Sequence, residues 1–499
     1  MSLLAGNSRI LAIFLAGVLS MSAVNVFATV LIPVDSADDG ADDNPGNGFC
    51  HTAAGTCTLR AAIMEANRTS GAGATIVLPA GTYKLQIGAH DADGEDNGDL
   101  NLSVPPGYTP GVTTITGTSG AALTIIDAQQ IDRVLRVDPS RTVFISGVTL
   151  SNGLISDPQK GAGIDNSGTL TLTDIVIRDN TVSASSGGGI YNGGVLYLTR
   201  GMVSGNKASN GGAIYNDGLA TLGDTTMIAN QAIGDIGAGS GGAVYNFGVL
   251  TANRCTLSSN SIISGKNRGG AIFNFDGGVI SLDSCTISFN SADFGGGIFA
   301  EGSLTILNTT VAFNSSNFDG GGIYAAEGLS SAFNGNIYSS TIIANDADQD
   351  QTFDGAGGGV YIEGSSGNGF NIYNTILAGN IVANHQEYDD CSAISGGVLK
   401  THARNLFGSG MGCTIDQISG SYADVNSLAY LGSLRNNGGP TQTVALLAGS
   451  NAIDGTIAGT GCKDSQSVAI PVDQRGYPRT GMCDVGAFEY DDIFIAGFE

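Results

Sequence analysis

The sequence lacks tryptophan altogether, and it is poor in proline, in basic residues and in charged residues of any kind. Its 499 residues include 11 Pro, 20 Lys and Arg, and 45 Asp and Glu, and charged residues make up only 13% of the chain. So few charges exclude a coiled coil, and a hydrophobic content of 42% excludes a disordered chain. The formal net charge of −25 excludes nucleic acid and anionic lipid as partners, because both would be repelled.

Long apolar runs are also missing, except near the N-terminus. There, one basic residue, Arg9, precedes an apolar run over residues 10–18, and the segment ends with Val26-Phe27-Ala28. This three-part pattern predicts a signal peptide over residues 1–28 that is cleaved after Ala28. Polar residues at 20, 22 and 25 interrupt the run, so it is too short for a membrane anchor. We therefore expect a protein that is secreted or held at the bacterial cell surface or outer membrane, with no transmembrane segment in the mature chain.

Eight cysteines suit an oxidising compartment, and they fall in local pairs along the chain. The short spacings favour disulfides over zinc, because the four histidines are scattered and give no pattern of paired ligands. The expected disulfides are Cys50–Cys57, Cys391–Cys413 and Cys462–Cys483.

Glycine, in contrast, is abundant, and many of the 77 glycines belong to an internal repeat. One repeated unit reads Gly, Gly or Ala, Ile or Val, then an aromatic residue, and a second unit ends in asparagine. The asparagines recur at intervals of 24 to 35 residues, at Asn180, Asn206, Asn230, Asn260, Asn290, Asn314, Asn345 and Asn380. The glycine content and the period-two alternation exclude a helical repeat. Short strands, glycine corners and this period predict a parallel β-helix over residues 104–385.

Residues at fixed distances from each asparagine share their chemistry, which predicts the vertical register of the coils. The residue three positions before each asparagine is apolar in all eight units, as at Leu257 and Ile287, so we expect a buried column. Five positions before the asparagine, Cys255 and Cys285 are expected to be stacked free thiols, with a disulfide as the alternative. The asparagines themselves are expected to pass amide hydrogen bonds from coil to coil.

The outer face of the coils carries a charged column in the same register. Six positions before the asparagine, Asp174, Arg200, Asp224 and Arg254 alternate in sign. Opposite charges on neighbouring strands attract, so we expect ion pairs between successive coils.

The aromatic residues of the first unit form a second outward column. They are Tyr191, Tyr215, Tyr245, Phe273, Phe299, Tyr324 and Tyr361, and each follows an Ile or Val that should point inward. Two interpretations stay open. The column is a platform for an extended glycan or another partner, or its rings stack on one another or lie beneath a loop.

An acidic loop is the candidate site for a cofactor, which would be calcium. Its oxygen ligands would come from Asp91, Asp93, Glu95, Asp96 and Asp99, which alternate with other residues as in hard-cation loops. The full twelve-residue calcium pattern is missing, and a solvated acidic loop is the alternative. No other cofactor is expected.

The N-terminal region resembles a known family. Residues 57–63 (CTLRAAI), 65–67 (EAN) and 75–83 (TIVLPAGTY) resemble the CSLREA domain of bacterial secreted proteins. The chain departs from that motif at Thr58 and at Ala61, where the family has Glu, so any role of that Glu is absent here. Apolar residues at 59, 62, 63 and 66 predict a short amphipathic helix over residues 59–67 that caps the first coil. We assign this cap to residues 29–103.

The C-terminal region and the repeats resemble two further families. Residues 390–392 (DCS), 405–408 (NLFG), 431–434 (LGSL), 436–441 (NNGGPT), 452–454 (AID), 473–476 (DQRG) and 483–489 (CDVGAFE) resemble the choice-of-anchor Q domain, with Asn451 in place of the usual Pro. The repeats, such as the one at 296–298 (GGI), are similar to polymorphic outer-membrane-protein repeats. The domain that resembles the choice-of-anchor Q domain is assigned to residues 386–490, and a tail of residues 491–499 follows.

These resemblances imply export and surface display on an all-β, right-handed parallel β-helix of the pectin-lyase-like type, and they imply no catalytic residue. We expect a monomer with a structural or adhesive role that binds a polysaccharide or a surface protein. The alternative is a carbohydrate-active enzyme, a polysaccharide lyase or a hydrolase. An outward cluster of at least two carboxylates and a basic residue in one groove would indicate this enzyme.

Overall fold

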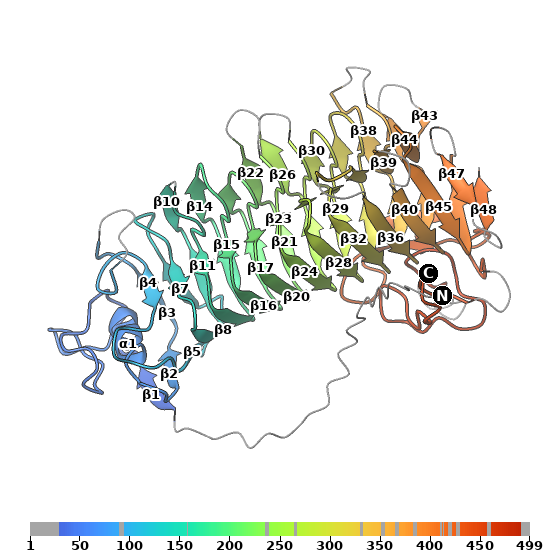
Figure 1. The fold of residues 1–499 in the computed structure, drawn as a ribbon. Coiled ribbons are helices and arrows are strands. Elements are labelled where there is room, and N and C mark those ends of the chain that lie inside the picture. The colour runs from blue at the N-terminus through green and yellow to red at the C-terminus, as the bar shows by residue number, and fades with distance from the viewer. Residues whose placement is uncertain are drawn as a thin grey trace, which may run out of the picture.

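The computed structural model describes residues 29–490 apart from 89–93, 157, 235–238, 264–266, 330–332, 351–354, 365–368, 383–386, 410–411, 413, 418–421, 426–429 and 457–460. The predicted signal peptide with its cleavage site at Ala28, and the tail 491–499, lie outside the described residues. Within the described ranges, the chain has one α-helix and four long sheets that stack along one axis (Figure 1). The predicted all-β parallel β-helix is confirmed. No helix found in these ranges is long and apolar enough to cross a membrane.

Sheets A and B are the two longest sheets, with parallel neighbours throughout. Sheet A comprises β1 (Val30–Pro33), β2 (Ala74–Leu78), β5 (Val112–Gly117), β8 (Thr142–Ser146), β12 (Thr169–Thr173), β16 (Val195–Thr199), β20 (Leu219–Gly223), β24 (Val249–Asn253), β28 (Val279–Asp283), β32 (Ser303–Leu307), β36 (Asn334–Tyr338), β40 (Gly369–Tyr373), β45 (Val398–His402) and β47 (Ile415–Gln417). Sheet B comprises β3 (Gly81–Lys84), β6 (Thr124–Asp127), β9 (Thr149–Ser151), β13 (Val176–Arg178), β17 (Met202–Ser204), β21 (Thr226–Ile228), β25 (Thr256–Ser258), β29 (Thr286–Ser288), β33 (Thr310–Ala312), β37 (Thr341–Ile343), β41 (Ile376–Ala378), β46 (Arg404–Phe407) and β48 (Tyr422–Val425).

Sheets C and D complete each coil. Sheet C comprises β4 (Leu100–Leu102), β7 (Leu135–Val137), β11 (Ile164–Asn166), β15 (Ile190–Asn192), β19 (Ile214–Asn216), β23 (Val244–Asn246), β27 (Ile272–Asn274), β31 (Ile298–Ala300), β35 (Ile323–Ala325), β39 (Val360–Glu363) and β44 (Cys391–Ile394). Sheet D comprises β10 (Leu154–Ser156), β14 (Thr181–Ser183), β18 (Lys207–Ala208), β22 (Gln231–Ile233), β26 (Ser261–Ile263), β30 (Ser291–Ala292), β34 (Ser315–Ser316), β38 (Asp346–Ala347), β42 (Ile381–Val382) and β43 (Glu387–Tyr388). Only the β42–β43 pair of these four sheets is antiparallel among the described strands.

The vertical register follows the sequence repeat. Leu257 in β25 lies opposite Ile287 in β29, and both side chains are buried. On the outer face, Arg200 binds Asp174 at 2.7 Å and Arg254 binds Asp224 at 2.6 Å, which confirms the predicted charged column. Cys255 and Cys285 are buried free thiols, as predicted.

Two ladders of buried asparagines hold the corners of the coils. In the predicted ladder, each side-chain Nδ2 donates to Oδ1 of the next asparagine, from Asn180 through Asn380, at 2.9 to 3.0 Å. A second ladder links Asn166, Asn192, Asn216, Asn246 and Asn274 at 2.7 to 2.9 Å. The second ladder stops where Ala300 replaces the asparagine. Buried amides are stable here because each finds a partner one coil away.

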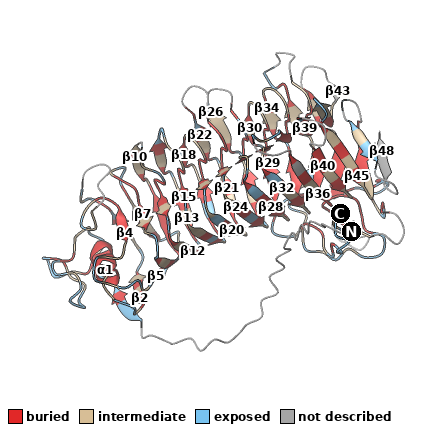
Figure 2. Cartoon of the chain, in the orientation of Figure 1, coloured by how far each residue is buried: buried red, intermediate tan, exposed pale blue. Residues whose placement is uncertain are grey.

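A short helix caps the first coil, as predicted. Helix α1 (Leu59–Ala66) begins at the N-cap Thr58 and is buried along its whole length (Figure 2). Arg60 of this helix binds Asp39 at 2.7 Å, and both side chains are almost fully buried. The predicted Cys50–Cys57 disulfide, present in this cap, closes the loop before the helix.

The coils continue beyond residue 385, because β44, β45, β46, β47 and β48 extend three of the sheets to Val425. The chain then forms a hairpin of β49 (Leu431–Arg435) and β50 (Thr443–Leu446). The described residues of 430–490, which we call the C-terminal clamp, turn back along the outer face of sheet B (red in Figure 1). The clamp contains the predicted Cys462–Cys483 disulfide. Cys391 is also disulfide-bonded, and its predicted partner Cys413 lies outside the described residues.

Gln474 connects the clamp to the coils. Its amide nitrogen donates to the Cys285 carbonyl at 2.9 Å, and its amide oxygen accepts from the Thr310 hydroxyl at 2.6 Å. Clamp contacts of this kind bury the outer faces of β29 and β33, whereas the same face is half-exposed in β13 and β21.

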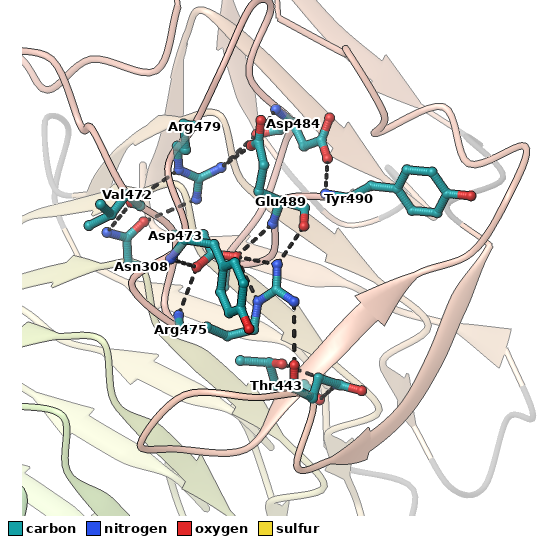
Figure 3. A network of polar contacts seen from close by, with 12 residues as sticks. Asn308, Thr443, Val472, Asp473, Arg475, Arg479, Asp484, Glu489 and Tyr490 are labelled. Atoms are coloured by element: carbon teal, nitrogen blue, oxygen red, sulfur yellow. Dashed lines mark hydrogen bonds and ion pairs between the residues drawn. The ribbon is translucent and has the colours of Figure 1, made fainter. Parts of the chain in front are cut away.

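Figure 3 shows a buried ionic network inside the clamp. Asp473 binds Arg475 at 2.7 Å, and Arg479 binds Glu489 at 3.1 Å. Burial is the main cause that raises the pKa of Glu489 to about 7, and the charge of Asp484 adds to it. Burial likewise raises the pKa of Asp484 to about 6.

These raised pKa values predict that stability falls as the pH rises from 4.5 to about 7. Above the ordinary Glu value of 4.5, the unfolded chain releases a proton that folded Glu489 retains until about pH 7, so each rise in pH favours unfolding. The measurement is the melting temperature of the wild type and of Glu489→Gln at several pH values. Because the variant cannot ionise, the wild type should lose stability relative to it as the pH rises. A difference that stays constant would contradict this prediction.

Candidate ligand-binding groove

The predicted aromatic column forms on the outer side of sheet C. Strand register places Tyr191, Tyr215, Tyr245, Phe273, Phe299, Tyr324 and Tyr361 one above the other. The Ile or Val before each ring points inward and is buried. The outward direction and the stacking follow from the alternation of side chains along a strand.

Most ring faces in the column are taken up by neighbouring rings. Tyr215 and Tyr245 stack with centroids 4.7 Å apart and planes at 9°, and Phe299 and Tyr324 stack at 4.6 Å and 12°. A ligand would therefore meet ring edges and hydroxyl groups along most of the column. The first three rings are half-exposed, whereas the last four are only 3% to 6% exposed.

The C-terminal half of the column lines a groove of about 930 Å³. Its floor consists of Phe299, Tyr324 and Tyr361. Two further columns form its walls. One contains Arg268, Phe294 and Asp319, and the other contains Glu301, Ala326 and Glu363, with Glu327 beside it.

The walls arise from the same register as the floor. Arg268, Phe294 and Asp319 each stand five residues before a ring of the column, and bridges join residue 240 to Arg268 and Arg268 to Phe294. Glu301 and Glu363 stand two residues after Phe299 and Tyr361, and residues two apart on a strand share a face. The repeat thus concentrates aromatic, acidic and basic side chains in one groove.

The charged groups of the groove are partly paired. Arg268 Nη1 lies 2.8 Å from Glu301 Oε1, and its guanidinium lies 5.0 Å from the Phe299 ring centroid. Burial raises the pKa of Glu301 above its ordinary value, although the positive charge of Arg268 opposes this shift. Glu301 is therefore more readily protonated than an exposed glutamate.

The tyrosine hydroxyls in the groove stay protonated. The Tyr324 hydroxyl donates to Glu363 Oε2. Burial and this hydrogen bond raise the pKa of Tyr324 well above its ordinary value, and burial, followed by the charges of Asp319 and Glu363, raises that of Tyr361. The groove therefore offers hydroxyl groups and carboxylate acceptors above an aromatic floor.

The N-terminal half of the column is closed by its own polar contacts. The Lys160 ammonium lies 4.3 Å from the Tyr191 ring centroid and 3.2 Å from its hydroxyl, which also contacts Asp217 at 3.2 Å. Burial, with a further contribution from Asp217, raises the pKa of Tyr191 to about 12. We therefore centre the candidate site on the C-terminal half.

The candidate calcium ligands are dispersed where the structure describes them. Glu95 binds Arg68 at 2.9 Å, Asp99 is fully buried and binds Arg133 at 2.6 Å, and Asp96 is exposed. Asp91 and Asp93 lie outside the described residues. Among all residues that the structure describes, no group of three or more His, Cys, Asp or Glu is arranged to hold a metal ion. Calcium binding stays a prediction.

Sequence reasoning found the floor of the groove and missed its walls. Glu301, Glu363, Asp319 and Arg268 were not singled out. The available signal was their constant offset from the aromatic column, two residues after a ring or five before it. The cluster of carboxylates and a basic residue in one groove is the feature that the enzyme alternative requires.

Comparison with known proteins adds a similarity of fold. No protein-family model and no curated protein matches the sequence. The structure is similar to the crystal structure of the pectate lyase Pel9A, with a TM-score of 0.35 and 15% sequence identity over 93% of this chain and 98% of that chain.

Proposed function

We propose that this chain is an exported β-helix protein, held at the cell surface, that binds an extended glycan in the groove without cleaving it. The observation that carries the proposal is the combination of an aromatic floor with hydroxyl groups and carboxylates in one groove. Sugars are recognised by such a combination, because their C–H faces pack on apolar surface while their hydroxyls need polar partners. The signal-like N-terminus, the disulfides and the family resemblances support export.

Binding without cleavage is supported by the ion pair of Arg268 with Glu301. Among the described lining residues, Arg268 is the only basic one. A lyase needs a base that abstracts a proton from the sugar. Arg268 is already engaged in an ion pair, because its Nη1 lies 2.8 Å from Glu301 Oε1.

The second candidate function is glycoside hydrolysis. Two carboxylates in one groove, Glu301 and Glu363, match the number that hydrolysis requires, one as acid and the other as base or nucleophile. The raised pKa of Glu301 suits the acid, which has to be protonated near the working pH.

The test is a glycan-binding screen of the mature chain together with an assay for newly formed sugar ends. Tyr361→Ala is expected to weaken glycan binding about tenfold, since it removes the ring edge and the hydroxyl group that line the groove, a loss on the order of 1 kcal/mol or more. The matched control is Tyr197→Ala, because Tyr197 is 45% exposed on sheet A, outside the groove. A second variant, Tyr324→Phe, keeps the buried ring and removes only the hydroxyl group. If it also weakens glycan binding, the weakening comes from a lost contact and not from a disturbed fold.

Two outcomes would contradict this proposal. If Tyr361→Ala and Tyr197→Ala affect binding equally, the groove is not the binding site. If new sugar ends form with the wild type and not with Glu301→Gln, the second candidate function replaces the first.

A further inference from the structure

We infer that the groove selects a glycan with free amino groups, a hexosamine polymer, over its N-acetylated form and over polymers of uronic acids. This inference rests on the proposed function and names the ligand class of the same site. It is carried by the charge of the groove walls, by the position of those charges relative to the aromatic floor, and by the spacing of the coils.

The groove is strongly acidic. Its lining includes four carboxylates, Glu301, Asp319, Glu327 and Glu363, against one guanidinium, that of Arg268. The formal charge of these five side chains is therefore one minus four, or −3. The whole chain carries a formal charge of −25, so the field around the groove has the same sign. A protonated amino group is attracted to such a site, and a uronate carboxylate is repelled.

The carboxylates stand where a sugar on the floor would place its substituents. Glu363 is exposed and accepts a hydrogen bond from the Tyr324 hydroxyl, whose ring belongs to the floor. Glu363 lines the groove, and a carboxylate accepts several hydrogen bonds at once. An ammonium group on a sugar above Tyr324 or Tyr361 would thus form a charge-assisted hydrogen bond, which is stronger than one from a neutral hydroxyl.

The spacing of the coils favours a glycan over a basic peptide. Tyr324 and Tyr361 lie in register on adjacent strands, with ring centroids 4.8 Å apart. An extended peptide repeats its side-chain direction every two residues, about 6.8 Å, and would lose register with the coils. A pyranose unit in an extended glycan rises by close to one coil spacing, so the glycan stays in register with the coils along the groove.

The experiment compares three oligosaccharides of matched length by calorimetric titration of the mature chain: glucosamine, N-acetylglucosamine and galacturonate oligomers. At mildly acidic pH, where the amino groups are protonated, the glucosamine oligomer should bind about tenfold more tightly than the N-acetylated one. Glu363→Gln should narrow this difference. The matched control is Asp179→Asn, because Asp179 is an exposed carboxylate on the sheet B side of the coil, outside the groove.

Each outcome decides between the possibilities. Equal affinity for the glucosamine and N-acetylglucosamine oligomers, or tighter binding of the galacturonate oligomer, would overturn the inference and leave glycan binding intact. Binding of a lysine-rich peptide without binding of any glycan would overturn both the inference and the proposed function. A preference for glucosamine that Glu363→Gln reduces and Asp179→Asn leaves unchanged would support the inference.

Discussion

Replacing Arg479 with methionine is expected to lower the free energy of unfolding by about 3 to 5 kcal/mol, because it removes a buried guanidinium and leaves its hydrogen-bond acceptors without a partner. Arg479 is only 2% exposed and binds Glu489 at 3.1 Å. Its guanidinium also donates to the Gly486 carbonyl at 2.7 Å. It donates as well to Asn308 Oδ1 at 3.1 Å (Figure 3). Asn308 belongs to the coils, so Arg479 joins the clamp to the β-helix. Methionine keeps most of the apolar stem and removes only the charged group.

The measurement is urea unfolding, followed by limited proteolysis of the folded variant. Cleavage should appear within residues 430–490, because the loss of the guanidinium loosens the clamp before the coils. The matched control is Arg178→Met, which removes an exposed arginine from its pair with Asp179 and should cost less than about 1 kcal/mol. Equal unfolding midpoints for the two variants would mean that the network in the clamp contributes no more than a surface ion pair.

The vertical register of the coils was predictable because each column repeats its chemistry. Leu257 and Ile287 are both apolar and hold the same offset from an asparagine, as do the alternating charges of Asp174 and Arg200. A one-residue slip would expose every inward side chain, so only one register buries them all. The second asparagine ladder carried the same signal and was missed. Asn192 and Asn216 stand one residue after the aromatic rings, but only the rings were read as a column.

The path of the clamp was not predictable from the repeat. Gln474 reaches Cys285, 189 residues earlier, and Thr310, 164 residues earlier, and none of these contacts repeats along the chain. A contact made once leaves no periodic pattern. The resemblance of residues 473–476 to a family motif indicated a C-terminal domain, but did not indicate that this domain would lie against sheet B.

The groove was predictable in part for the same reason. The aromatic column repeats seven times and was found, whereas the column two residues after the rings is mixed, with Gly193, Asp217, Phe247, Phe275 and Ala326 beside Glu301 and Glu363. A mixed column leaves no repeated pattern in the sequence, so the carboxylates that line the groove did not stand out. The burial of Tyr324 and Tyr361 depends on residues of neighbouring columns, among them Phe294 and Ala326, and so required the fold.

Asn260→Ala is expected to lower the free energy of unfolding by about 2 to 6 kcal/mol, because it strands two buried backbone groups that each cost about 1 to 3 kcal/mol. Asn260 Oδ1 accepts from the Asn230 backbone N–H at 3.0 Å, and its Nδ2 donates to the Met227 carbonyl at 3.0 Å. Alanine can do neither, and the side chains that pack around the site exclude water. Urea unfolding measures the change. Asn253→Ala is the matched control, since Asn253 is half-buried at the outer end of β24 and water can replace its partners.

The aspartate at the end of the ladder suggests a second variant, Asn260→Asp, which removes the hydrogen-bond donor and keeps the acceptor. After Asn380, the ladder ends at Asp390, whose Oδ1 accepts from the Asn380 backbone N–H and from its Nδ2, both at 2.8 Å. An acceptor is sufficient there, and burial raises the pKa of Asp390 to about 6.

Within the ladder, Asn260→Asp would keep the acceptor but lose the donor to Met227 and to Asn290, and it would bury a charge. Its destabilisation should therefore decrease as the pH falls and the carboxyl group becomes protonated, whereas that of Asn260→Ala should not. If both variants respond alike to pH, a buried charge contributes nothing to the destabilisation caused by Asn260→Asp.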